Sequence, residues 1–190
     1  MRKQVLFIQG GGDGGYEADE KLAASLQKAL GMGYEISYPR MQTDEAVTDF
    51  GWPLQIGNEI GKLNDGVILI AHSLGASLLL KYLAENKIFK KIAGIFLAST
   101  PFWSGKEDWK RGLKLRDDFA ECLPENTPVF FYHCRDDEEV SFDNLTTYRQ
   151  KLPEAIFRAI ESGGHQLGNG VKLVANDIKT LSVNPRDNVQ

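Results

Sequence analysis

The sequence predicts an α/β fold, a three-layer α/β/α sandwich around a mostly parallel sheet of about six strands. Short apolar runs alternate along the chain with stretches whose apolar residues recur at helical spacing. Most of these runs are continuously apolar, which is typical of parallel strands covered on both faces. The length of 190 residues suits one domain. We therefore expect a single domain over residues 1–190, with a polar tail from about residue 182 to 190.

Each predicted element follows from a local pattern and its boundary residues. The predicted strands are residues 4–9, 34–38, 67–71, 92–97, 128–133 and 155–160. The predicted helices are residues 17–30, 52–63, 74–85, 141–151 and 171–181. Gly31 ends the first helix, Pro53 lies in the first turn of the second, and Ser141 is expected as the N-cap of the fourth. Residues 40–51 are expected to be irregular, and one or two helical turns are expected within 102–122.

The stretch from Val67 to Leu80, VILIAHSLGASLLL, combines the clearest strand with the clearest helix. Ser73 stands at the sharp turn between them, where a hydroxyl is raised above the sheet edge. Small residues are needed two positions before and after such a serine, and Ala71 and Gly75 meet that need. The pattern predicts that Ser73 is a nucleophile. The simpler alternative is a serine that caps the helix.

A serine nucleophile needs a base and a carboxylate that orients the base. Asp136 and Asp137 directly follow the strand 128–133, and either could be that carboxylate, although an acidic solvated loop would also explain them. His165, in SGGHQLGNG, follows the last strand and completes the chain order serine, acid, histidine that this type of fold uses. His72 and His133 are interpreted as structural.

The oxyanion of an acyl-transfer intermediate needs backbone donors, one after the serine and one in the loop after the first strand. Leu74 and Gly11 are the predicted donors. Because ligands bind beyond the carboxyl ends of parallel strands, we expect five strand-end residues to gather at one edge. They are Gln9, Ser73, Ser99, Asp137 and His165. The candidate substrate-binding residues are Gln9, Gly10, Gly12, Phe102 and Trp103, with Trp109 as a further aromatic candidate.

Charge and composition narrow the class of partner. A formal net charge of -4 and a pI near 5.4 argue against a nucleic-acid surface. No window of the sequence is apolar enough for a membrane span. The apolar run at the N-terminus is too short for the hydrophobic region of a signal peptide. Cys122 and Cys134 lack a CxxC spacing, which favours a reduced cytoplasmic protein. The three histidines have no metal-ligand spacing. We expect a small-molecule substrate, no metal and no cofactor.

Four motifs resemble the α/β-hydrolase superfamily, specifically the small lidless serine hydrolases of the retinoblastoma-binding serine hydrolase and YdeN-like group. They are IAHSLG around Ser73, HCRDDEEVS around Asp137, GGHQL around His165 and IQGGG around Gly10. The resemblance covers nearly the whole chain. It implies a nucleophilic Ser73, a basic His165 and an orienting Asp137, which the spacing from the aspartate to Val140 selects over Asp136. The implied reaction is hydrolysis of an ester, thioester or amide through an acyl-enzyme.

Two positions depart from that family pattern. Ala71 replaces the commoner first glycine of GxSxG, and Gln9 replaces the usual histidine before the oxyanion glycine. The two leading antiparallel strands of larger members are missing, and no insertion is large enough for a separate lid. The resemblance therefore implies a compact six-stranded α/β-hydrolase fold without a lid.

Two other functions fit part of the sequence. Gly10, Gly12 and Gly15 satisfy GxGxxG after a first strand, as in a nucleotide-binding oxidoreductase. However, no acidic residue ends the second predicted strand, and no tyrosine has a lysine four residues later. The second alternative is a non-catalytic binding module on a hydrolase scaffold, because fold alone does not fix function.

Overall fold

Six parallel strands form one sheet in the order β2–β1–β3–β4–β5–β6. The strands are β1 (Lys3–Ile8), β2 (Tyr34–Ser37), β3 (Val67–His72), β4 (Ile92–Ala98), β5 (Val129–Cys134) and β6 (Ile156–Ile160). The computed structural model describes residues 2–106 and 108–181, except for the side chains of residues 108 and 109. The predicted polar tail therefore lies outside the described residues. The predicted α/β class and the parallel sheet are confirmed.

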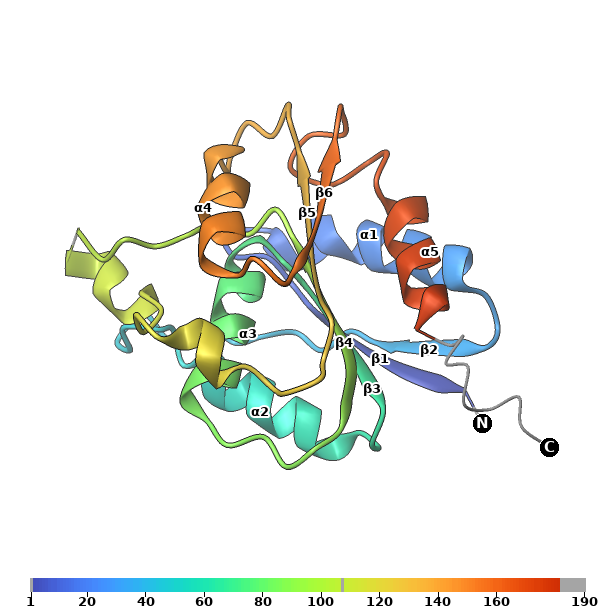
Figure 1. Cartoon of the computed structure of the whole chain (residues 1–190), viewed down its shortest axis with the longest axis horizontal. Coiled ribbons are helices and arrows are strands. Elements are labelled where there is room, and N and C mark those ends of the chain that lie inside the picture. Colours follow the sequence, from blue (N-terminus) through green and yellow to red (C-terminus); the bar gives the residue numbers. More distant parts are fainter. Residues whose placement is uncertain (1, 107, 182–190) are drawn as a thin grey trace.

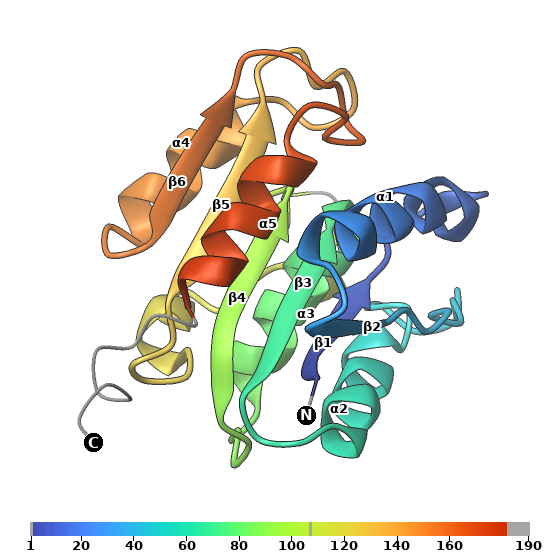
Figure 2. The same ribbon diagram turned by 90° about the vertical axis from the view of Figure 1, so that its right-hand side faces the viewer.

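Helices cover both faces of this sheet (Figure 1). They are α1 (Gly15–Leu30), α2 (Trp52–Lys62), α3 (Ser73–Glu85), α4 (Asp143–Lys151) and α5 (Val171–Thr180). Helices α1 and α5 lie side by side on one face, in front of the strands in Figure 2, and α2, α3 and α4 cover the other. No helix of the described residues is long and apolar enough to cross a membrane.

Two of the predicted helices, α1 and α4, begin at a different residue in the structure. Helix α1 begins at Gly15 rather than residue 17, because Gly14 adopts a left-handed backbone with φ 81° and turns the chain into the helix earlier. Helix α4 begins at Asp143, so Ser141 is not its N-cap; Phe142 holds that position. The Ser141 hydroxyl still accepts a hydrogen bond from the Asp143 amide at 3.3 Å. It therefore satisfies one free donor of the first turn from outside the helix.

Alternation along the buried strands divides the core into two halves. In β1, Val5 and Phe7 pack with residues of α1 and α5, whereas Leu6 and Ile8 pack with residues of α2 and α3. All four side chains are at most 1% exposed. Every residue of β3 is buried as well. This explains why these strands are continuously apolar in sequence, since neither face of the sheet meets water.

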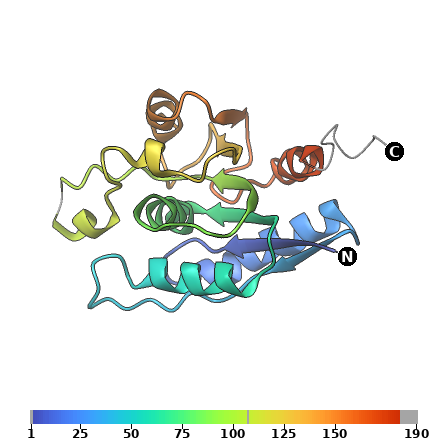
Figure 3. The same ribbon diagram turned by 60° about the horizontal axis from the view of Figure 1, so that its bottom comes forward.

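The segment between β4 and β5 contains two short 3-10 helices, η1 (Asp108–Leu113) and η2 (Phe119–Cys122). It extends from the body of the domain beside the loop that follows β2 (Figure 3). The contact is close at one point, where a Cβ atom on Gly112 would lie 2.1 Å from the carbonyl oxygen of Thr48. The helical turns predicted within 102–122 are confirmed, in the tighter 3-10 form.

Strand order places the candidate site. The chain leaves β1 toward α1 on one face and leaves β3 toward α3 on the other, although β1 and β3 are neighbours. Adjacent strands whose connections diverge in this way open a crevice at their carboxyl ends. The glycine loop after β1 and Ser73 after β3 both lie at this crevice.

Candidate active site

Ser73 occupies a strained turn at the junction of β3 and α3. Its φ of 50° lies in the left-handed region that non-glycine residues rarely adopt. The turn brings α3 against the end of β1, where a Cβ atom on Gly75 would lie 2.1 Å from the carbonyl oxygen of Gln9. Only glycine fits there. The fully buried Ala71 is likewise small. This close approach is the physical reason for the small residues around the serine.

The glycine loop after β1 lies directly beside this turn. A Cβ atom on Gly11 would come within 2.5 Å of the Leu74 side chain, so the Gly11 and Leu74 backbones are neighbours. Gly11 and Gly12 line a hollow together with Ser73 and Leu74. Two backbone segments therefore meet next to the serine, as an oxyanion hole requires.

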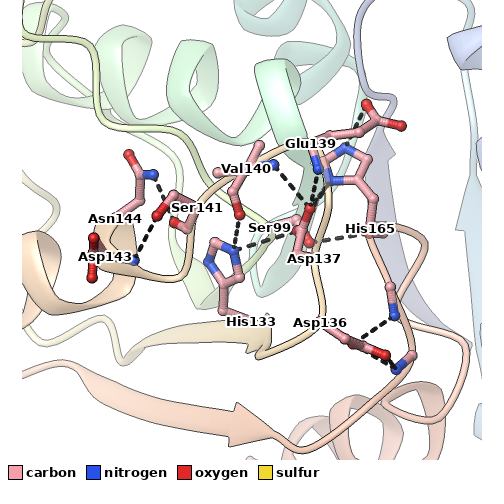
Figure 4. A network of polar contacts seen from close by, with 12 residues as sticks. Ser99, His133, Asp136, Asp137, Glu139, Val140, Ser141, Asp143, Asn144 and His165 are labelled. Carbon is pink, nitrogen blue, oxygen red and sulfur yellow. Dashed lines mark hydrogen bonds and ion pairs between the residues drawn. The ribbon is translucent and has the colours of Figure 1, made fainter.

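His165 and Asp137 are directly bonded in the structure (Figure 4). The Nδ1 atom of His165 lies 3.0 Å from Oδ1 and 3.0 Å from Oδ2 of Asp137. The loops after β5 and β6 bring the two residues together, although 28 positions separate them. A hydrogen on Nδ1 donated to this carboxylate leaves Nε2 as the basic nitrogen of the ring. Ser73 and His165 line one common hollow.

The Asp137 carboxylate accepts hydrogen bonds from three donors, one of them Nδ1 of His165, and lies close to a fourth. Its Oδ1 accepts hydrogen bonds from the Val140 amide at 2.9 Å and the Glu139 amide at 3.0 Å. Nε2 of His133, which donates to the Val140 carbonyl at 2.8 Å, lies 3.4 Å from Oδ2. Burial alone would raise the pKa of Asp137, but the hydrogen bonds from His133, His165 and Val140 outweigh it and hold that pKa far below its ordinary value. Asp137 is therefore ionised at neutral pH.

Asp136 has a different task from Asp137. Its carboxylate accepts hydrogen bonds from the amides of Gly163 and Gly164, at 2.9 to 3.1 Å, and it does not contact His165 (Figure 4). These two amides lower the pKa of Asp136. The residue thus ties down the loop that carries His165. Of the two adjacent aspartates, the structure brings only Asp137 to the histidine.

The backbone of His165 is also fixed. Its carbonyl oxygen accepts hydrogen bonds from the Ser99 hydroxyl at 3.0 Å and from Nε2 of His72 at 2.9 Å. Ser99 and His72 are almost fully buried. The five strand-end residues therefore lie at one edge of the sheet, as expected: Gln9, Ser73, Ser99, Asp137 and His165.

The larger hollow at Ser73 has a volume of about 480 Å³. Phe102 and Trp103 line it, as predicted for substrate-binding residues, together with Phe50 and Leu113. The Trp103 indole donates to the Ser77 hydroxyl at 2.9 Å. The side chain of Trp109, the third aromatic candidate, lies outside the described residues. The smaller hollow contains Gly10 and Gly12 beside Ser73. The site therefore joins an aromatic pocket to a glycine-lined one.

Gln9 does not reach either hollow, which corrects the expectation that it contacts substrate. It is only 5% exposed. Its Oε1 accepts the Met41 amide at 3.0 Å, and its Nε2 donates to the Gly10 carbonyl at 3.3 Å. The side chain turns inward because Met41 presents an amide that needs an acceptor. Gln9 therefore anchors the glycine loop from its buried side.

Two residues at the site were missed from the sequence. Glu139 lines both hollows, with Oε2 3.6 Å from Nε2 of His165. Asp19 on α1 is fully buried and contacts His72 at 2.9 Å. A signal for Asp19 existed, because it shares the apolar face of its helix with Leu22 and Leu26, where an acid needs a buried partner. Nothing in the sequence distinguished Glu139 from its acidic neighbours.

Comparison with known proteins agrees with this geometry. The serine hydrolase family model matches residues 25–171. No curated protein matches the sequence significantly. The structure of SOBER1 from Arabidopsis thaliana is similar, with a TM-score of 0.68 at 18% identity over 96% of this chain and 100% of that one.

Two bacterial structures are similar to the same extent. The ydeN product of B. subtilis gives a TM-score of 0.66 at 18% identity, covering 96% of this chain and 100% of that one. Est1E from Butyrivibrio proteoclasticus gives 0.66 at 16% identity, covering 96% and 87%. These likenesses show an α/β-hydrolase fold. Because the family model spans most of the chain, from α1 to the start of α5, the protein belongs to the serine hydrolase family.

Proposed function

We propose that this hydrolase cleaves an ester, thioester or amide of a small substrate through an acyl-enzyme on Ser73, most readily as a carboxylesterase. The observation that carries the proposal is the His165–Asp137 pair, hydrogen-bonded at 3.0 Å, with His165 lining the same hollow as Ser73. An orienting carboxylate, an imidazole and a serine on a strained turn together perform acyl transfer.

The steps follow from this arrangement. His165 Nε2 removes the proton from the Ser73 hydroxyl while Oγ attacks the substrate carbonyl carbon. The oxygen that becomes negative is held by the amides of Gly11 and Leu74. His165 then gives its proton to the leaving group as the bond to the carbonyl breaks. Water, activated by the same nitrogen, releases the acyl group and restores Ser73.

The aromatic hollow supports a small organic acyl or leaving group. Its volume of about 480 Å³ is within the range of small-molecule sites. Phe102 and Trp103 supply apolar walls, and Lys110, Glu139 and Asn144 add polar and charged groups to the lining.

The dinucleotide alternative fits the glycine loop poorly. The carboxylate of Asp19, on α1, contacts this loop and accepts a hydrogen bond from the Gly10 amide at 2.6 Å. A pyrophosphate would need such amides free and would meet a negative charge. Titration with NAD(P)H should therefore give no saturable change in fluorescence.

The direct test is a panel of p-nitrophenyl esters of increasing acyl length, with a matched thioester and anilide. Wild-type protein should hydrolyse at least the short esters, and Ser73→Ala should reduce the rate to background. A folded wild type that cleaves none of the panel would favour the binding-module alternative. Equal rates in the two proteins would show that Ser73 is not the nucleophile.

A further inference from the structure

A second histidine–aspartate pair lies buried behind Ser73. Nδ1 of His72 is 2.9 Å from both carboxylate oxygens of Asp19, and Nε2 of His72 is 2.9 Å from the carbonyl oxygen of His165. Both side chains are about 1% exposed. Each nitrogen of the His72 ring therefore faces an oxygen in a nearly buried site.

The chemistry of these partners fixes the protons. A carbonyl oxygen can only accept, so Nε2 of His72 must carry a hydrogen. Oδ2 of Asp19 also accepts the Gly10 amide at 2.6 Å, which favours the ionised carboxylate, and Nδ1 must then be a donor too. A neutral imidazole has only one N–H and cannot satisfy both contacts. Beside an ionised Asp19, both contacts are made only by the doubly protonated ring.

We infer that His72 is an imidazolium paired with Asp19 at neutral pH, and that this buried pair is a positioning device for the active site. The inference rests on the proposed function. Asp19 holds Gly10 in the oxyanion loop, His72 directly precedes Ser73, and the His72 ring holds the backbone of His165. The three segments that supply the oxyanion donor, the nucleophile and the base are therefore tied at one point.

Two carboxylates near His72 favour its cationic form. Asp19 faces it from α1, and Asp137 acts on it from the loop after β5. The His165 ring lies beside it, with ring centroids 4.7 Å apart, and Tyr38 is close to Asp19 at the end of β2. Burial alone would lower the pKa of His72. The hydrogen bond and charge of Asp19, the His165 carbonyl and the charge of Asp137 outweigh burial and raise that pKa.

The direction of the pKa shift of His72 determines the pH range in which the His72–Asp19 pair is intact. A raised pKa in the folded protein keeps the pair intact at neutral pH and releases it as pH rises through the folded value. Loss of the proton leaves one of the two contacts of His72 unmade and frees either the oxyanion loop or the His165 loop. Activity should therefore show a falling limb at alkaline pH.

The first test does not depend on turnover. In wild-type protein with 15N-labelled histidine, NMR at about pH 8, where an ordinary histidine is neutral, should show a proton on each ring nitrogen of His72. A singly protonated ring at that pH would overturn the inference. Because the measurement needs no substrate, it distinguishes failure of this inference from failure of the proposed hydrolase activity.

The second test compares two buried aspartates. In Asp19→Asn, kcat for a p-nitrophenyl ester should fall by roughly 10- to 100-fold with little change in KM, and the alkaline limb should move to lower pH. Asp177 is the matched control, since it is also buried and bonds Tyr132 at 2.8 Å and Arg158 at 3.0 Å. Asp177→Asn should leave the alkaline limb of the pH profile at the same pH as in the wild type.

Two outcomes would contradict the positioning role. One is an unchanged pH profile in Asp19→Asn, and the other is the same displacement of the limb in both variants. If Asp19→Asn does not fold, the protonation state of His72 in the wild type decides the inference alone.

Discussion

Nδ1 of His165 lies at the same distance, 3.0 Å, from the two carboxylate oxygens of Asp137. The contact fixes the ring and directs its other nitrogen away from the carboxylate. It also joins loops that follow two neighbouring strands, β5 and β6.

Replacing each of the two neighbouring aspartates by asparagine in turn should distinguish their roles. Asp137→Asn should lower kcat by about 10³-fold or more, because the amide cannot hold the required tautomer of His165 or stabilise its cation. Asp136→Asn is the matched control and should retain most activity, since Asp136 only binds the amides of Gly163 and Gly164. Steady-state kinetics on one ester measures both. Equal losses would reject the assignment of Asp137.

The stability contributed by Asp137 should depend on pH. The pKa of this buried carboxyl is depressed, so its stabilising effect is present above its unfolded pKa and is lost as pH falls below it. Asp137→Asn should cost about 3 kcal/mol of unfolding free energy near pH 7, and this difference should shrink below about pH 4. Urea denaturation at several pH values measures it. A difference that stays constant down to pH about 3 would be inconsistent with a depressed pKa.

The close approach of α3 to β1 should make Gly75 irreplaceable. Gly75→Ala would force a Cβ atom to within 2.1 Å of the Gln9 carbonyl oxygen, and we expect a loss of about 3 kcal/mol in unfolding free energy. Gly61→Ala in α2 is the control, because nothing lies within 4 Å of its Cβ position and alanine favours a helix by about 1 kcal/mol. Thermal denaturation of both variants tests the contrast, and equal melting temperatures would refute it.

Trp103 should limit the size of the acyl or leaving group. Trp103→Ala removes a wall of the hollow beside Ser73 and should raise the ratio of kcat/KM for an octanoyl ester over an acetyl ester by roughly tenfold. Phe89→Ala, at an aromatic residue that is 85% exposed, should leave the ratio unchanged. A ratio that does not move in Trp103→Ala would remove this residue from the substrate pocket.

The sequence predicted the sheet well because its central strands are buried on both faces, so apolar runs such as those of β1 and β3 are unambiguous. Ser73 and His165 could be picked out because each follows a strand in a glycine-bearing turn. The choice between Asp136 and Asp137 depended on family resemblance, since side-chain direction in a tight loop is set by long-range partners, here Gly163 and His165.

Other features required the tertiary structure. The inward turn of Gln9 depends on the Met41 amide, which belongs to a loop 32 residues away. The partnership of His72 with Asp19 spans 53 residues and two layers of the fold. His72 was rightly expected to be structural in the sense that it is buried, but its contact with the His165 backbone has no local signature. Contacts of this kind are not encoded in local periodicity.

The central claim, a nucleophilic hydroxyl on Ser73, is tested most directly by a fluorophosphonate probe followed by peptide mapping. Wild-type protein should be labelled once, on the peptide that contains Ser73, and the folded Ser73→Ala variant should remain unlabelled. Equal labelling of the two proteins, or no labelling of a folded wild type, would contradict the account.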